Sequence, residues 1–449
     1  MTRLKRELIT AYNDSRYNKD RDLLCRAPFS NIYFNVIGQA AACWLTFANA
    51  PRYPEKSLHD IWFGEYFEGL RNCIREADLT SRCGVCEQNI KRHLFQNTLA
   101  RAYDNDHTLT RYPLIMEFEL SNTCNLGCTM CNGRLSSTIR AKRDGLKPHA
   151  SPYDAAFVTQ LEEFIPHLKE ARFNGGEPFL QKICWQIWER IISLNSAVEI
   201  TIATNGTIWT DKVADILSRG RFRINLSLDG MSRETYESIR VGSNYDKVME
   251  NIHKFGAYCR DRGTFFSLMI NPMRTNWREL PLFIEFCNRH SYHLAFNTVY
   301  RPFHLALWTL PSQELVSIHK ALSGIQFEAP FDGNEQKYRN LVDIQILTWA
   351  QEQQRREQTG GDYVTEQSLR LQAKDEFSAK LIGAYLDQAA LDKATEKLRL
   401  LEQKVAKNVN EADFYSILHE APIEWLKHDF ENKNLDELAE AIYYKSKYY

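Results

Sequence analysis

The chain has 449 residues, 44% of them hydrophobic, so it is long enough to form two or three domains with substantial buried cores. Its 56 Lys and Arg residues balance 57 Asp and Glu residues, which leaves a formal net charge of -1. A chain with this balance has no overall attraction to a polyanion, so neither nucleic acid nor a membrane surface is expected as a partner.

The N-terminal segment is charged from the third residue onward, and no run of 18 uncharged apolar residues occurs in the chain. The sequence therefore predicts a soluble, cytoplasmic protein without a signal peptide or a membrane span. Thiols stay reduced in the cytosol, where clustered cysteines more often bind metal or take part in catalysis than form disulfides. The positions of the eleven cysteines are therefore informative.

Residues 1–105 form a first region, rich in aromatic residues and cysteines. Residues 65–79, EYFEGLRNCIREADL, show helical spacing of apolar residues. Four cysteines of this region stand as two separated pairs, Cys25 with Cys43 and Cys83 with Cys86. Four thiolates in two pairs are the number that closes a metal site completely, and a zinc site is one reading of them.

Residues 106–305 form a second region. A polar stretch over 101–113, which spans the boundary between the two regions, is predicted to be a linker. From residue 114 onward, short apolar strands alternate with amphipathic helices about six times, ending near residue 299. This alternation predicts a parallel sheet with crossover helices. Six β/α units are fewer than the eight of a complete barrel, so the prediction is a partial (β/α)6 TIM-like barrel in an α/β protein.

Residues 306–449 form a third region, in which strand signals fade and charged helices are expected. The polar stretch 351–363, QEQQRREQTGGDY, is predicted to be a loop. Apolar residues then recur at spacings of three and four and predict one face of a helical hairpin, namely Leu391, Ala394, Leu398, Leu401 and Val405.

The segment 121–133, SNTCNLGCTMCNG, places Cys124, Cys128 and Cys131 directly after the first predicted barrel strand. In an α/β barrel that position is the carboxyl-end mouth, where active sites are built. A structural zinc site uses four protein ligands, and no fourth cysteine lies nearby. Three thiolates suit instead a four-iron cluster with one iron open to another ligand.

Four later segments close the following strands at the same mouth. They are FNGGEPFL (173–180), ATNGT (203–207), SLDG (227–230) and MINPMRTNWREL (269–280). Glycines let a backbone approach a ligand closely, a carboxylate such as Glu177 satisfies an ammonium group, and Ser227 and Asp229 can bond hydroxyls. Each segment taken alone also fits an ordinary turn.

The cysteine spacing followed by these segments in this order resembles the signature of the radical S-adenosylmethionine (radical SAM) superfamily. The resemblance implies that Cys124, Cys128 and Cys131 hold a catalytic [4Fe-4S] cluster whose open iron binds S-adenosylmethionine. Reductive cleavage of that cofactor, with electrons from a reductant such as ferredoxin or flavodoxin, would give a 5'-deoxyadenosyl radical that abstracts hydrogen from a substrate. The cofactor-binding residues that the resemblance implies are Gly175, Gly176, Glu177, Pro178, Thr204, Asn205, Ser227, Asp229 and Asn276, with Arg274 as an alternative to Asn276.

The N-terminal pattern C-x12-G-x4-C, made by Cys25, Gly38 and Cys43, resembles the opening of a SPASM domain, an auxiliary iron-sulfur module. No further cysteines lie between Cys86 and Cys124, so the region resembles the truncated Twitch form with a single auxiliary [4Fe-4S] cluster. Here the module precedes the barrel, whereas in the family it usually follows. A structural zinc site made by the same four cysteines is the alternative.

Relatives with such modules mostly oxidise or cross-link side chains of peptides, so the resemblance implies a peptide substrate, with a sugar or small metabolite as the alternative. A zinc-stabilised binding protein and an electron-transfer protein are the hypotheses outside radical catalysis. The other four cysteines, Cys73, Cys184, Cys259 and Cys287, lie in predicted helices and are expected to be packing residues.

Overall fold

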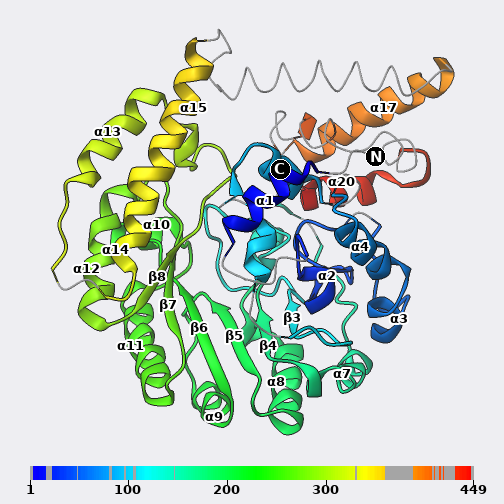
Figure 1. The fold of residues 1–449 in the computed structure, drawn as a ribbon, viewed down its shortest axis with the longest axis horizontal. Helices are drawn as coiled ribbons and strands as arrows, with labels where there is room; N and C mark the ends of the chain where they lie inside the picture. Colours follow the sequence, from blue (N-terminus) through cyan, green and yellow to red (C-terminus); the bar gives the residue numbers. More distant parts are fainter. Residues whose placement is uncertain are drawn as a thin grey trace.

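The computed structural model describes residues 4–16, 23–47, 49–79, 83–95, 98–104, 108–145, 147–328, 331–358, 388–406, 409, 414–415, 418 and 430–445. These residues form one eight-stranded sheet in the order β2-β1-β3-β4-β5-β6-β7-β8 (Figure 1). Neighbouring strands are parallel except for β1 and β2. The strands are β1 (Asn31–Phe34), β2 (Ala40–Ala41), β3 (Ile115–Phe118), β4 (Glu170–Phe173), β5 (Glu199–Thr204), β6 (Arg221–Ser227), β7 (Phe266–Ile270) and β8 (His293–Phe296).

The six strands predicted for residues 106–305 are present as β3 to β8, joined by helical crossovers. Parallel neighbours need such crossovers because both strands run in the same direction. This arrangement confirms the predicted α/β partial barrel. The crossover elements are α6 (Ser137–Lys142), α7 (Ala155–Leu161), η3 (Ile165–His167), η4 (Pro178–Leu180), α8 (Lys182–Leu194), α9 (Asp211–Arg219), α10 (Arg233–Ile239), α11 (Tyr245–Arg262), η5 (Trp277–Glu279) and α12 (Leu280–His290).

The two faces of the sheet differ in chemistry, because successive side chains of a strand point to opposite sides. In β5, Ile200, Ile202 and Thr204 are buried, and alternate with the half-buried Glu199 and Thr201. The apolar set faces the helices α8, α9 and α11, which line the outside of the sheet (Figure 1). The inner face of the barrel is therefore polar.

The N-terminal region adds two strands that its sequence does not predict. The short strand β1 pairs in parallel with β3, in a register that sets Asn31 opposite Ile115 and Phe34 opposite Phe118. All four β1 residues are buried, so the segment NIYF lacks the alternation by which strands are recognised. The region therefore extends the barrel sheet beyond β3.

Short helices surround these two strands. The helix predicted over residues 65–79 is present as α4 (Glu65–Arg75), with Phe67, Leu70 and Ile74 buried. The other helical elements are α1 (Arg6–Asp14), α2 (Ala27–Ser30), α3 (Leu58–Trp62), α5 (Gly84–Lys91) and η2 (Leu99–Tyr103).

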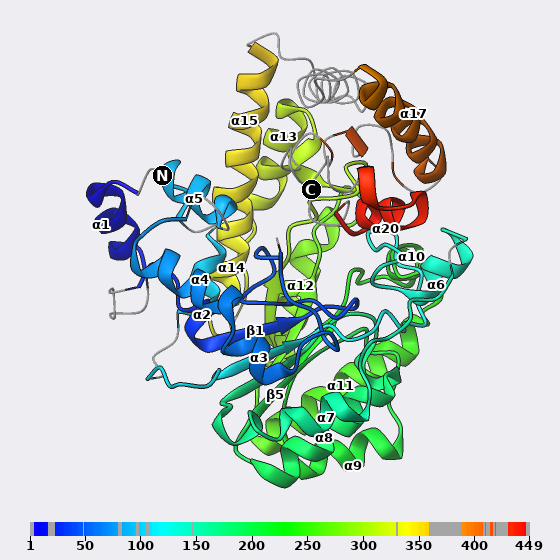
Figure 2. The same cartoon turned by 90° about the vertical axis from the view of Figure 1, so that its right-hand side faces the viewer.

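The C-terminal region is helical where the structure describes it (Figure 2). The loop prediction for 351–363 is wrong over 351–358, which lie in α15, because Gln, Glu and Arg favour helices even without apolar periodicity. Residues 359–363 lie outside the described part. The elements are η6 (Leu307–Thr309), α13 (Ser312–Ser323), α14 (Asn334–Arg339), the π-helical η7 (Asn340–Ile346), α15 (Leu347–Gln358), α17 (Gln388–Val405) and α20 (Leu435–Lys445).

The predicted apolar face of the hairpin lies on α17, where Ala394, Leu398, Leu401 and Val405 are buried. This face belongs to a separate apolar cluster that includes Leu438 of α20. In the part of the chain that is described, each helix is either too short or too polar to cross a lipid bilayer.

Candidate functional site

The loop with three cysteines begins at the carboxyl end of β3 and ends at α6. Hydrogen bonds inside the loop fix its shape: Asn122 Nδ2 donates to Gly133 O (2.9 Å), and Ser136 Oγ donates to Leu126 O (2.6 Å). Ser136 also accepts the Ile139 N–H and so caps α6. The predicted placement at the barrel mouth follows from these local contacts together with the end of β3.

The thiols of Cys124 and Cys128 in this loop interact electrostatically. Burial raises the pKa of Cys128, and negative charge on Cys124 raises it further, whereas the Arg240 guanidinium opposes both effects. Arg240 Nη1 lies 4.0 Å from Cys128 Sγ, and Asn205 Nδ2 lies 3.9 Å from Cys124 Sγ. Cys131 is half-buried at the end of the same loop.

The segment 175–178 packs directly onto the cysteine loop. Gly175 and Gly176 have φ values of +76° and +56°, a region that residues with a Cβ rarely adopt. A Cβ on Gly175 would lie 2.4 Å from Glu119 Cγ, and one on Gly176 would lie 2.4 Å from Thr123 O. Both glycines are thus required by the contact between the two loops.

Glu177 joins three strand ends in one buried contact. Its backbone N–H donates to Thr123 O (2.8 Å), and its carboxylate accepts from Thr204 Oγ1 (2.9 Å) and Asn205 N (2.7 Å). It also accepts the Phe179 N–H at the start of η4, which begins at Pro178. Burial raises the pKa of Glu177 to about 7, because the hydrogen bonds from its three donors, Asn205 N, Phe179 N and Thr204 Oγ1, offset only part of the desolvation. The structure therefore brings together the predicted residues Gly175, Gly176, Glu177, Pro178, Thr204 and Asn205.

The predicted residues after β6 and β7 form a second buried network. Both carboxylate oxygens of Asp229 are used inside the protein: Oδ2 pairs with Arg240 (2.6 Å), and Oδ1 accepts the Asn271 N–H (2.7 Å). Asn276 Nδ2 donates to Asp229 O, and its Oδ1 accepts the Met273 N–H. Asp229 and Asn276 therefore hold the mouth in shape, and their role in cofactor binding stays a prediction.

Two other predicted residues lie at the edges of this network. Ser227 is the last residue of β6, next to the network, and is half-buried. Arg274 donates to Ala306 O and Thr309 Oγ1, so its guanidinium points towards η6.

Arg240 also lies at this site, and the sequence does not predict it there. It follows α10, and its guanidinium is buried between Asp229 and Cys128. No motif marks it, because its contacts depend on the return of the chain after α10. The only available signal was an arginine directly after an apolar helix position, in ESIRVG.

The four N-terminal cysteines are at positions 25, 43, 83 and 86, and the last three lie within electrostatic range of Cys25. Cys25 precedes α2, Cys43 follows β2, and Cys83 and Cys86 lie at the start of α5. Burial raises the pKa of Cys25, and negative charge on each of the other three raises it further. A metal site shared by the four cysteines stays a prediction.

Backbone N–H groups point at three of these four thiols. Ala27 N lies 3.4 Å from Cys25 Sγ, the Leu45 N–H bonds Cys43, and the Leu99 and Ala100 N–H groups bond Cys86. Burial still raises the pKa of Cys43 to about 12, so the apo-protein holds a thiol there. Donors arranged around sulfur stabilise thiolates, so the site fits a group that binds thiolates.

In neither set of cysteines, all of which the structure describes, are three thiols close enough together to bind one metal ion. Among the described residues, no three His, Cys, Asp or Glu side chains are grouped so as to hold a single metal ion. Ligands of a four-iron cluster bind different irons, whereas structural zinc takes its four ligands about one ion.

A buried glutamate connects the N-terminal site with the barrel interior. Glu117 of β3 accepts hydrogen bonds from Asn31 Nδ2 (2.8 Å), Trp44 Nε1 (3.1 Å) and Tyr103 Oη (2.9 Å). Trp44 is the residue after Cys43, and its side chain is 42% exposed. Burial raises the pKa of Glu117, and Arg172, 3.9 Å away, opposes that rise. The N-terminal region and the barrel therefore share one polar interface at Glu117.

Comparison with known proteins places a family match over the barrel. Residues 118–287 match the family model described as the Radical SAM superfamily. GTP 3',8-cyclase of Clostridium botulinum (strain Hall) is 25% identical over 139 residues, which are 31% of this chain and 42% of that protein. The probable GTP 3',8-cyclase of Methanothermobacter marburgensis is 27% identical over 189 residues, which are 41% of this chain and 57% of that protein. The chain thus spans about half the length of these two curated relatives.

Solved structures give a looser likeness. Streptococcus suis SuiB bound to S-adenosylmethionine superposes with a TM-score of 0.36 at 12% identity, over 59% of this chain and 66% of that chain.

Proposed function

We propose, from the radical SAM superfamily domain that the chain carries over residues 118–287, that this protein is a radical SAM enzyme with one auxiliary cluster. Cys124, Cys128 and Cys131 would hold the [4Fe-4S] cluster that binds S-adenosylmethionine. Bound together, the two would supply a 5'-deoxyadenosyl radical, which takes a hydrogen atom from the substrate. The observation that carries the proposal is the contact of the three-cysteine loop with Gly175, Gly176 and Glu177.

The chain's own residues would position the cofactor and shield it. The 175–177 turn offers backbone groups at the mouth, and Glu177 fixes that turn to the ends of β3 and β5. Arg240 places a positive charge beside Cys128, where it stabilises the ionised thiolate that binds iron. Ser227, the half-buried last residue of β6, would bind a hydroxyl or carboxylate group of the cofactor, and Thr204 would act through Glu177, to which its hydroxyl donates.

The N-terminal cysteines would hold an auxiliary [4Fe-4S] cluster. With four protein ligands this cluster has no open iron, so its part would be electron transfer, such as accepting an electron from the substrate radical. Its position beside Trp44, which is partly exposed and donates to Glu117 of the barrel strand β3, supports such a part. A zinc site is the alternative for the same cysteines.

A peptide is the substrate that we propose, by likeness of the N-terminal region to a Twitch module. The names of the curated relatives favour the second candidate, a small nucleotide. A low-potential protein such as ferredoxin or flavodoxin would supply the electrons.

Transfer of isotope from substrate to cofactor tests both candidates. The reconstituted protein is incubated anaerobically with S-adenosylmethionine, dithionite and either a peptide library deuterated at Cβ positions or ribose-deuterated GTP. We expect 5'-deoxyadenosine to form and to carry deuterium from the peptides alone. Deuterium from GTP would replace the peptide by the nucleotide, and absence of 5'-deoxyadenosine from both incubations would contradict radical catalysis.

A further inference from the structure

Tyr12 of α1 presents an unsatisfied hydroxyl in the protein interior. Its side chain is fully buried, and its Oη has no hydrogen-bond partner among the described residues. A buried hydroxyl without a partner loses its hydrogen bonds to water and gains none in return. Such a group in a folded protein calls for a partner that is bound at the site.

The surroundings of Tyr12 indicate where that partner would lie. Tyr12 and Cys86 belong to the same buried cluster, and Cys25 and Cys83 pack against it. Burial raises the pKa of Tyr12, and negative charge on Cys25 and on Cys86 raises it further. The Arg16 guanidinium opposes this rise, and Tyr12 shares its buried cluster with Cys86 and the adjoining Cys25.

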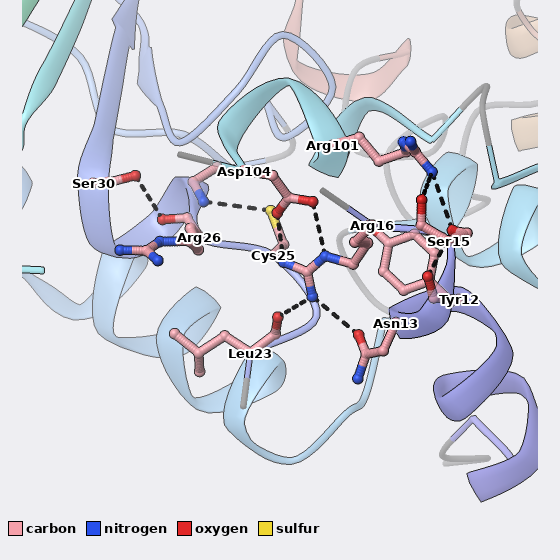
Figure 3. A network of polar contacts seen from close by, with 11 residues as sticks. Tyr12, Asn13, Ser15, Arg16, Leu23, Cys25, Arg26, Ser30, Arg101 and Asp104 are labelled. Atoms are coloured by element: carbon pink, nitrogen blue, oxygen red, sulfur yellow. Dashed lines mark hydrogen bonds and ion pairs between the residues drawn. The ribbon is translucent and has the colours of Figure 1, made fainter. Parts of the chain in front are cut away.

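An ion pair between Arg16, which follows α1, and Asp104 lies near Cys25 (Figure 3). Arg16 Nε donates a hydrogen bond to the Asp104 carboxylate (2.9 Å). Arg16 Nη1 donates to the side-chain oxygen of Asn13 and to the backbone oxygen of Leu23. Both members of the ion pair are buried, with side-chain exposures of 0% and 2%. Leu23 is two residues from Cys25, and Asp104 follows η2, whose N–H groups bond Cys86. The Arg16 guanidinium also lies 5.3 Å from the Tyr12 ring centroid.

We propose that the Tyr12 hydroxyl donates a hydrogen bond to the inorganic group held by Cys25, Cys43, Cys83 and Cys86, and that α1 is the cap of that site. The inference rests on the proposed auxiliary cluster. Sulfides and thiolates of such a cluster accept hydrogen bonds, and these bonds are one determinant of its reduction potential. A donor favours the more negative, reduced state, so Tyr12 raises the potential.

The first test isolates the auxiliary cluster in the full chain. Cys124, Cys128 and Cys131 are replaced by Ala, and the midpoint potential of the remaining cluster is measured by redox titration followed by electron paramagnetic resonance. Tyr12→Phe should lower the midpoint potential of this cluster. A shift of about 59 mV corresponds to a tenfold fall in the ratio of reduced to oxidised cluster at a fixed applied potential. Tyr338→Phe is the matched control, since this buried tyrosine of α14 donates to Leu322 O and should leave the potential unchanged. An unchanged potential in Tyr12→Phe would overturn the proposal.

The second test does not depend on redox chemistry. In metal-free protein, Tyr12→Phe removes an unpaired hydroxyl and should leave the Tm unchanged or raise it; in loaded protein it removes a hydrogen bond and should lower the Tm. A shift of the same sign in both forms would overturn the proposal. If metal analysis finds zinc in place of the auxiliary iron, the proposal of an auxiliary cluster is refuted. The same Tm comparison in zinc-loaded protein then tests whether Tyr12 donates a hydrogen bond to the zinc-bound thiolates.

Discussion

At the scale of single residues, Arg240 and Asp229 form a buried ion pair at the barrel mouth, 2.6 Å long. Arg240 is 6% exposed and Asp229 is fully buried. Arg240→Gln leaves Asp229 charged without its partner, so we expect the free energy of unfolding of the metal-free protein to fall by about 3–5 kcal/mol. Denaturant unfolding measures this change.

The control for Arg240→Gln is an exposed pair of the same type. Arg219 and Glu189 lie 2.6 Å apart with side-chain exposures of 39% and 51%, so Arg219→Gln should cost less than about 1 kcal/mol. Equal effects of the two substitutions would contradict the role of Arg240 as a buried charge.

His149 makes the protein sensitive to acid. Burial lowers the pKa of His149 to about 4 from an ordinary value of 6.5, and Arg140 and Arg134 lower it further while Glu440 opposes them. The unfolded chain therefore binds more protons than the folded chain between these values, so stability is present above pH 6.5 and is lost as the pH falls towards 4. His149→Gln should reduce the loss of unfolding free energy between pH 7 and pH 5. An identical loss in wild type and variant would refute this prediction.

At the scale of elements, the turn after β4 is shaped by its contact with the cysteine loop. Gly175→Ala meets both a left-handed backbone and the Glu119 side chain, whereas Gly145→Ala meets the same backbone strain in open space. We expect Gly145→Ala to cost about 1–2 kcal/mol of unfolding free energy and Gly175→Ala to cost more by about 1–3 kcal/mol. Denaturant unfolding of metal-free protein compares them, and a cost for Gly175→Ala no larger than that for Gly145→Ala would contradict the contact.

At the scale of the whole molecule, the N-terminal region and the barrel share the sheet and the Glu117 interface. Glu117→Gln turns an NH2 donor towards the Asn31, Trp44 or Tyr103 donors, so it should lower the unfolding free energy by about 1–3 kcal/mol. Because β1 pairs with β3, amide hydrogen exchange should speed up in β1 and in β3 together. Faster exchange in β1 alone would show that the two regions unfold separately.

The barrel and its mouth could be predicted from the sequence because their signals are local. Strands β3 to β8 carry apolar residues at alternate positions, and the cysteine loop, the 175–178 turn and Asn205 each follow a strand directly. In a parallel sheet all carboxyl ends meet at one edge, so chain order alone assembles them.

Contacts between residues far apart in the chain could not be predicted from the sequence. Strand β1 has no alternating pattern, and its pairing with β3 crosses about 80 residues. The sequence around Tyr12 indicates only an apolar position of an amphipathic helix. The spacing of residues does not indicate that Tyr12 lies near Cys86 or Cys25. Asp229 and Asn276 were expected to face a ligand, whereas the described structure shows their polar atoms engaged by Arg240, Asn271 and Met273.

Metal and sulfide content tests the two-centre proposal most directly. Iron, acid-labile sulfide and zinc are measured per chain after anaerobic reconstitution of wild type and of two variants, one with Cys124, Cys128 and Cys131 replaced by Ala and one with Cys25, Cys43, Cys83 and Cys86 replaced by Ala. We expect about eight irons and eight sulfides in the wild type and about four of each in either variant. About four irons with one zinc, the zinc lost only from the second variant, would contradict the auxiliary cluster, and reconstituted protein without iron would contradict radical catalysis altogether.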